Sequence, residues 1–198
     1  MTDQPQASRL KTHGLVKTAM LSVIAFVLMM LESQIPFFPE FLKIDLSDLP
    51  ALIGGLAMGP LAGVAIEAVK NILHLLMTTT GGVGELANFL IGSSLVVPAA
   101  LIYRRKKTKA MALVGLMAGV ATMAVAGALA NYYLLLPFYS TFFPLEAVIA
   151  MSAKANPAIK DLGSLILYGI VPFNLLKGLV LSILTLAVYK RISRVLHS

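Results

Sequence analysis

The chain alternates between apolar stretches of roughly 20 residues and short segments rich in polar residues, glycine or proline. A helix of that length crosses a hydrocarbon core of ~30 Å, whereas a membrane barrel would show alternation over segments of about ten residues. The pattern therefore predicts an all-α membrane protein with six transmembrane helices. We expect these helices over residues 15–31, 49–58, 61–77, 85–103, 110–133 and 172–189.

The segments between these helices contain the residues that most strongly break helices. Gly59-Pro60 ends the second helix early, so that helix is unusually short. An acidic segment with two prolines, residues 32–48, precedes it. A long connection with three prolines, residues 134–170, precedes the sixth helix, which opens at Pro172, a favoured first-turn position. We expect both segments to lie on the outer side of the membrane.

Composition supports a membrane location for nearly the whole chain. Apolar residues make up 58% and charged residues 13% of the 198 residues, against roughly a quarter charged in soluble domains. We therefore expect a polar tail over residues 1–13 and one six-helix domain over residues 14–198. The basic and then apolar start resembles a signal peptide. Its apolar run is too long and no small-residue cleavage site follows, so it reads as a retained first helix.

The net charge of +7 is concentrated beside the predicted helices. Eleven of the sixteen Lys and Arg residues lie in three clusters, at residues 9–17, 104–109 and 190–194. Cytoplasmic ends of membrane helices carry an excess of Lys and Arg, and six crossings place both termini and all three clusters on that side. The charge thus indicates topology rather than nucleic-acid binding. The chain has no Cys, which excludes disulfides and thiolate metal sites.

The third predicted helix carries a polar face inside an apolar stretch. Glu67, Lys70, Asn71 and His74 have the spacing i, i+3, i+4 and i+7, which places all four on one side of the helix, facing the bundle. Two interpretations stay open: an ion pair between Glu67 and Lys70 that ties helices together, or a ligand or proton path. A metal site is not expected, because one His and one Glu lack further ligands.

Further polar side chains lie toward the outer ends of the fourth to sixth helices: Glu85, Asn88, Asn131, Asn174 and Lys177. No acid lies within four residues of Lys177. The predicted start of the sixth helix places this lysine about 10 Å below the outer surface of the membrane. Its side chain then either snorkels to the surface or contacts a ligand. A mostly apolar pocket with a few aimed polar groups is typical of a small-molecule site. The pattern predicts such a pocket, open to the outside and covered by residues 32–48.

The absence of several sequence motifs argues against some classes of function. The chain has no P-loop, no H-E-x-x-H and no G-x-S-x-G. Glu67 is the one acid that the pattern clearly buries, so the paired carboxylates of a pump are not expected. His74 with Glu67 is the only candidate pair for an enzyme, and seven residues separate them along the helix. The sequence favours a small binding protein that a partner energises over an enzyme.

Four stretches carry a family resemblance: residues 41–76, with D-L-S-D-L-P before the second helix, residues 82–107, 131–139 (NYYLLLPFY) and 171–178 (VPFNLLKG). They resemble the riboflavin-specific substrate-binding subunits of energy-coupling-factor (ECF) vitamin transporters. The resemblance implies a six-helix protein of the bacterial plasma membrane with a flavin pocket in the outer half, and no cofactor beyond the transported riboflavin. It also implies a transmembrane coupling subunit and two cytoplasmic ATPases as partners.

The resemblance also implies site residues. The polar contacts to the flavin are expected from Asn131, Asn174 and Lys177, and residues 42–47 are similar to a segment that lids the pocket. The remaining candidates are Asp45, Leu46 and Ser47 in that lid, and Glu67, Lys70 and Asn88 on the helices. The family's first helix often presents small residues four apart. Thr18 and Ser22 keep this spacing here, but Ala19 departs from it because Val23 follows four residues later.

Three rival functions stay open at this point. The first is a related subunit for another small vitamin, with the same fold and a different pocket. The second is a proton-coupled carrier that uses Glu67 and His74. The third is an intramembrane enzyme with its base on the third helix.

Overall fold

The computed structural model describes the backbone of residues 4–142 and 144–196 and the side chains of residues 12–142 and 144–188. Its α-helices are α1 (Gln4–Met29), α2 (Asp48–Met58), α3 (Pro60–His74), α4 (Val83–Arg105), α5 (Lys109–Ala130), α6 (Leu136–Ser140), α7 (Leu145–Ala155), α8 (Leu162–Leu165) and α9 (Val171–Leu196). A 3₁₀ turn, η1 (Leu75–Met77), and two π-helical turns, η2 (Asn131–Leu135) and η3 (Ile166–Ile170), extend these helices. Strands β1 (Ser33–Gln34) and β2 (Lys43–Ile44) form a small antiparallel hairpin.

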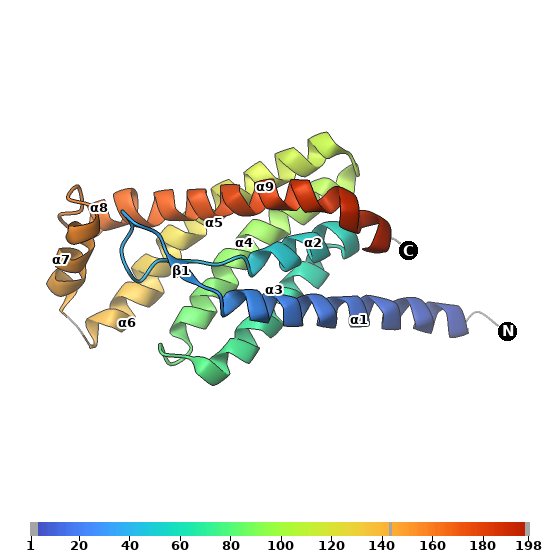
Figure 1. Cartoon of the computed structure of the whole chain (residues 1–198), viewed down its shortest axis with the longest axis horizontal. Coiled ribbons are helices and arrows are strands. Elements are labelled where there is room, and N and C mark those ends of the chain that lie inside the picture. The colour runs from blue at the N-terminus through green and yellow to red at the C-terminus, as the bar shows by residue number, and fades with distance from the viewer. Residues whose placement is uncertain (1–3, 143, 197–198) are drawn as a thin grey trace.

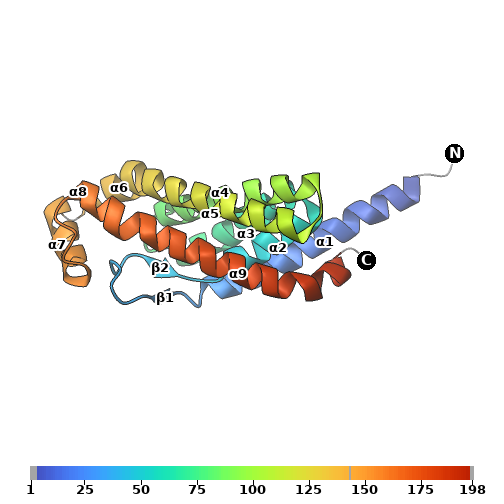
Figure 2. The ribbon, with the colours of Figure 1, turned by 90° about the horizontal axis from the view of Figure 1, so that it is seen from above.

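The long helices run side by side along the molecule, and α2 is the short member of the bundle (Figures 1 and 2). Both chain ends and the α4–α5 connection lie at one end, while the β-hairpin, α6, α7 and α8 lie at the other (Figure 1). Within the described residues, five helical stretches are long and apolar enough to cross a membrane. The 11 residues of α2 extend only about 16 Å.

The first helix begins earlier than expected, and part of the predicted topology lies outside the described residues. α1 starts at Gln4, within the stretch 1–13 that we expected as a tail. Nothing is described of residues 1–3, nor of the side chains at positions 9, 11 and 190–194, which carry most of the first and third basic clusters.

The break between α2 and α3 confirms the glycine–proline signal. Gly59 adopts φ 107°, a conformation that favours glycine, and Pro60 occupies the first turn of α3. α2 therefore ends at Met58, and the chain turns back into the bundle as α3.

The fifth and sixth predicted helices were wrong in their outer boundaries. The fifth continues past residue 133 through η2 into α6 and ends at Ser140, and the sixth begins at Leu162 rather than at Pro172. The expected long connection shrinks accordingly and contains α7. Each π turn lies just before a proline, Pro137 or Pro172, and a widened turn lets a helix pass a residue that has no N–H to donate.

The two largest groups of buried side chains lie at different places in the fold. The larger lies within the bundle and includes Leu52, Ile66, Leu95, Leu116 and Leu181, from α2, α3, α4, α5 and α9. The smaller lies at the hairpin end, where α6, α7, α8 and α9 pack on the loop, and includes Leu42, Leu136, Val148, Ile159 and Phe173. The candidate site lies between the two groups, since its lining includes Leu42 and Phe173 of the smaller group and Ile91, which packs against the larger one.

Candidate ligand-binding site

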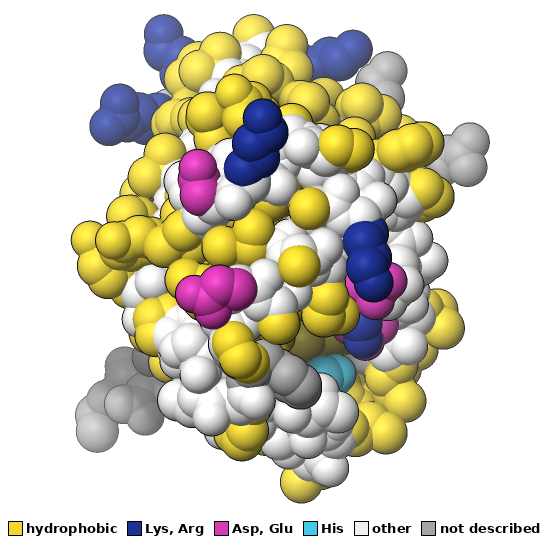
Figure 3. Space-filling model, turned by 90° about the vertical axis from the view of Figure 1, so that its left-hand side faces the viewer, with side chains coloured by type: hydrophobic (Ala, Val, Ile, Leu, Met, Phe, Trp, Pro, Cys, Tyr) yellow, Lys and Arg dark blue, Asp and Glu magenta, His cyan; other side chains and the backbone are white. Residues whose placement is uncertain are grey.

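A cavity of about 360 Å³ lies between the hairpin segment and the helices. This volume falls within the ~300–1,000 Å³ typical of ligand pockets. Figure 3 looks at the hairpin end of the molecule and shows a hollow with histidine, acidic and basic side chains close to it. The lining comes from α1, the 32–48 segment, α3, the turn before α4, α4, η2, α6 and α9: Met29, Glu32, Phe41, Leu42, Lys43, Asp45, Asp48, His74, Thr79, Thr80, Gly84, Glu85, Ala87, Asn88, Ile91, Gly92, Asn131, Leu135, Tyr139, Phe173, Asn174 and Lys177.

A buried ionic network forms the deep wall of this cavity. Lys177 Nζ lies 2.9 Å from Asp45 Oδ2 and 3.2 Å from Asp48 Oδ2. Asp48 also pairs through Oδ1 with Lys70, whose Nζ lies 2.8 Å from Glu67 Oε2 and donates to Ser47 Oγ at 2.8 Å. One carboxylate, Asp48, thus joins a lysine of α3 to a lysine of α9.

The network corrects the expected distribution of acids. Glu67 is buried as predicted, but Asp45, Asp48 and Glu85 are buried too. Asp45 and Asp48 reach this depth because the 32–48 segment descends into the bundle before α2 begins. Irregular backbone is tolerated at membrane depth where protein surrounds it. The first interpretation of the polar face is confirmed: Glu67 and Lys70 form an ion pair, now shared with Asp48.

Two asparagines flank the network, each at a π turn. Asn131 begins η2 and donates through Nδ2 to Gly127 O at 2.8 Å, while Asn174 follows η3 and donates to Ile170 O at 2.9 Å. The carbonyl oxygen of Asn131 is buried and accepts no hydrogen bond within the described residues. An unpaired buried acceptor is costly, so this oxygen is available for a donor on a ligand. Gly127 permits the close packing, since a Cβ there would lie 2.4 Å from Asn174 Nδ2.

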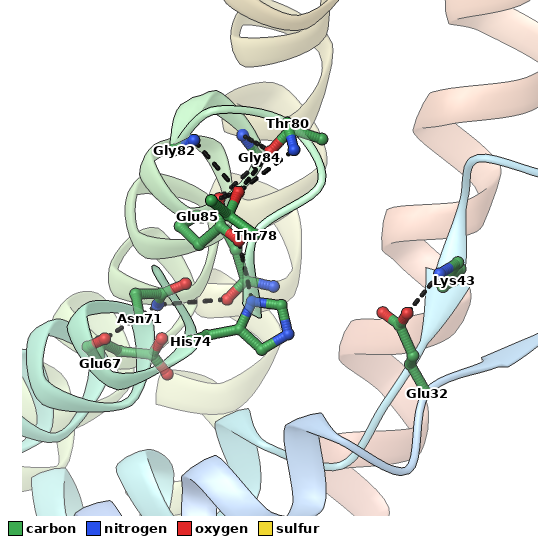
Figure 4. A network of polar contacts seen from close by, with 11 residues as sticks. Glu32, Lys43, Glu67, Asn71, His74, Thr78, Thr80, Gly82, Gly84 and Glu85 are labelled. Atoms are coloured by element: carbon green, nitrogen blue, oxygen red, sulfur yellow. Dashed lines mark hydrogen bonds and ion pairs between the residues drawn. The ribbon is translucent and has the colours of Figure 1, made fainter. Parts of the chain in front are cut away.

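A second polar group forms the wall opposite the hairpin, as Figure 4 shows. His74 Nδ1 lies 2.8 Å from Glu85 Oε1, and the hydroxyls of Thr78 and Thr80 donate to Glu85 Oε2 at 2.9 and 3.2 Å. Across from it, Lys43 of the hairpin pairs with Glu32 (Figure 4). The sequence suggested His74 with Glu67, but the structure pairs His74 with Glu85.

Comparison with known proteins places the chain in a family. The family model for the substrate-specific component of ECF transporters matches residues 13–189. The chain belongs to this family. It is therefore a transport protein of the bacterial plasma membrane, built from several membrane helices, and it is not an enzyme.

Individual relatives agree with this assignment. The chain is 38% identical over 179 residues to the riboflavin transporter FmnP of Bacillus subtilis (strain 168), covering 88% of each chain. It is also 38% identical over 182 residues to the riboflavin transporter RibU of Staphylococcus aureus (strain TCH60), covering 92% of this chain and 91% of that one. A solved S component of a bacterial ECF transporter superposes with a TM-score of 0.75 at 33% identity, covering 95% of this chain and 99% of the other.

The cavity of this S component brings together five of the nine expected site residues: Asp45, Asn88, Asn131, Asn174 and Lys177. Three others, Ser47, Glu67 and Lys70, are fully buried behind the cavity wall, in contact with one another through Lys70. Leu46 does not line the cavity, and its side chain is 36% exposed.

Lys177 lies deeper in the S component than the sequence indicated. Its helical stretch begins at Leu162, so fifteen residues, or about 22 Å of helix, precede it within a 27-residue span. Lys177 is also 5% exposed and held by two carboxylates, which is incompatible with snorkelling to the interface.

Sequence reasoning missed Asp48 as a member of the cavity, whereas His74 and Glu85 were among the polar groups expected at the outer ends of the helices and do line it. Asp48 stood within the D-L-S-D-L-P motif, which was noted only for its family resemblance. Of the many aromatic residues at this end of the molecule, Phe41, Tyr139 and Phe173 line the cavity. Phe41 and Tyr139 lie with ring centroids 6.1 Å apart.

Proposed function

We propose that this S component binds riboflavin in the cavity and delivers it to an ATPase-driven importer. The observation that carries the proposal is the group at the deep wall, where the unpaired Asn131 oxygen lies in one cavity with Asn174 and Lys177. Relatives at 38% identity that are named riboflavin transporters support the choice of ligand.

The chemistry of these side chains matches one edge of a flavin ring. The pyrimidine edge of isoalloxazine presents carbonyl oxygens and one ring N–H. The Lys177 ammonium only donates, so it pairs with a ring carbonyl, while the Asn131 oxygen accepts from the ring N–H. Leu135, Phe173 and Tyr139 provide apolar surface for the rest of the ring system.

The arrangement also supports the predicted topology. We propose six crossings with α2 as the short second one, a single membrane domain over residues 14–198, and both termini in the cytoplasm. The ends of the chain and the basic α4–α5 connection share one end of the bundle (Figure 1), where a positive charge excess favours the cytoplasm. The cavity then faces outward, with Leu42 and Lys43 of the hairpin segment in its lining.

The proposed partners follow from the family. S components bind the vitamin, and this chain carries no nucleotide-binding loop. We therefore propose a transmembrane coupling subunit and two cytoplasmic ATPases as its partners. A carrier driven by protons through Glu67 and His74 is disfavoured, because the two side chains belong to separate networks.

Titration of the purified protein with riboflavin, followed by quenching of flavin fluorescence, tests the proposal. Asn174→Ala and Lys177→Ala should each weaken binding by about 1–3 kcal/mol, because a buried partner is left unpaired. Asn156→Ala and Lys160→Ala, at positions outside the cavity, are matched controls that should bind as the parent does. Absence of riboflavin binding by the parent protein would refute the ligand. Unchanged affinity in both cavity variants would refute the site.

A further inference from the structure

His74 holds a fixed position on the α3–α4 wall of the cavity. It is the last residue of α3, its side chain is 20% exposed, and the ring lines the cavity. Nδ1 is occupied by Glu85 Oε1 at 2.8 Å. The other ring nitrogen, Nε2, has no hydrogen-bond partner among the described residues, and Figure 4 shows the ring turned away from the Thr78–Glu85 group on that side.

Hydrogen-bond directions around Glu85 determine which ring nitrogen carries the proton. Thr78 Oγ1 accepts from the backbone N–H groups of Thr80 and Gly82, each at 3.2 Å, and Thr80 Oγ1 accepts from the N–H of Gly84 at 2.9 Å. The two hydroxyl oxygens lie 3.3 Å apart, and each hydroxyl is within hydrogen-bond distance of Glu85 Oε2, an acceptor when Glu85 is ionised. Glu85 therefore acts as an acceptor throughout, and His74 Nδ1 must donate to it. In the neutral ring, Nε2 is then an acceptor.

The turn that supplies these N–H groups has a conformation that requires glycine at several positions. Gly81 and Gly82 have φ values of 59° and 93°, which favour glycine over other residues. Gly84 lacks a Cβ that would otherwise lie 2.7 Å from Thr80 Oγ1. The backbone thus holds both threonine hydroxyls against Glu85, and Glu85 orients the His74 ring.

We propose that His74 is a ligand-binding residue that accepts a hydrogen bond from the hydroxylated side chain of the flavin, and that Glu85 is its positioning residue. This inference assumes the proposed riboflavin function. The deep wall already provides an acceptor for the ring N–H, through Asn131. The hydroxyls of the ribityl chain are the remaining donors of the ligand, and the His74 acceptor lies on a different wall of the same cavity.

Comparison of riboflavin with lumiflavin, which has a methyl group in place of the ribityl chain, tests this assignment. The parent protein should bind riboflavin more tightly than lumiflavin. His74→Leu should lower riboflavin affinity about tenfold, the usual loss for one buried hydrogen bond, and leave lumiflavin affinity unchanged. His74→Gln, which keeps an acceptor, should retain most of the affinity. Glu85→Gln should reduce riboflavin binding selectively as well.

Control measurements distinguish the loss of a ligand contact from the loss of the folded cavity. Lumiflavin binding by each variant reports an intact cavity, Asn174→Ala should weaken both flavins, and His13→Leu on α1 should weaken neither. Equal losses for both flavins in His74→Leu, or no loss for either, would overturn the assignment. So would equal affinity of the parent for the two flavins. If the parent binds lumiflavin and riboflavin but His74 variants fail these criteria, the proposed function stands without this inference.

Discussion

Asp48→Asn tests whether the buried ionic network holds the hairpin segment in the bundle. Asp48 is 1% exposed and pairs with both Lys70 and Lys177, so the substitution keeps the shape and removes the charge that the two ammonium groups share. Loss of one partner from a buried ion pair costs ~3–5 kcal/mol. In the variant, Lys70 still pairs with Glu67 and Lys177 still pairs with Asp45. We therefore expect a loss of stability at the lower end of this range, about 3 kcal/mol.

The assay is thermal unfolding of the purified protein in detergent. For a chain of this size, 1 kcal/mol corresponds to about 2–4 °C, so Tm should fall by about 6–12 °C. Asp161→Asn is the matched control, because Asp161 is exposed and Asn caps a helix as well as Asp does. Glu67→Gln should lower Tm by less, because Glu67 pairs with Lys70 alone among the described residues. An unchanged Tm in Asp48→Asn would refute the role assigned to the network.

Two further substitutions separate binding from stability. Gly127→Ala places a Cβ 2.4 Å from Asn174 Nδ2, so riboflavin affinity should fall about tenfold in a fluorescence titration, whereas Gly14→Ala, with open space around it, should bind normally. Normal affinity in Gly127→Ala would show that the Asn174 amide does not contact the ligand. Thr108→Ala removes the N-cap that accepts from Met111 N, which should cost ~1 kcal/mol and lower Tm by about 2–4 °C without changing riboflavin affinity. A loss that Thr108→Ser does not restore would contradict the capping role.

Local patterns in the sequence predicted much of the architecture. The spacing of Glu67, Lys70 and Asn71 placed them on one buried face, because side chains three and four residues apart share a side of a helix. Gly59-Pro60 correctly ended α2, since both residues act on the backbone at their own position. These signals depend on neighbours within one or two turns.

The missed features depend on neighbours that lie far apart in the chain. Lys177 pairs with Asp45, and the two residues are 132 positions apart in the chain. No local sequence pattern around either residue indicates this pair. Pro137 and Pro172 suggested helix boundaries, yet a π turn before each lets the helix continue. The sequence named no contact partner for His74 for the same reason, since Glu85 comes from the next helix and not from the same face of α3.

The visible absorption spectrum of the protein, purified from cells that were supplied with riboflavin, tests the central claim most directly. We predict a flavin band with close to one flavin per chain in the parent protein, and loss of most of that band in a Lys177→Ala, Asn174→Ala double variant that still folds. A colourless parent protein that stays colourless when riboflavin is added would contradict the account.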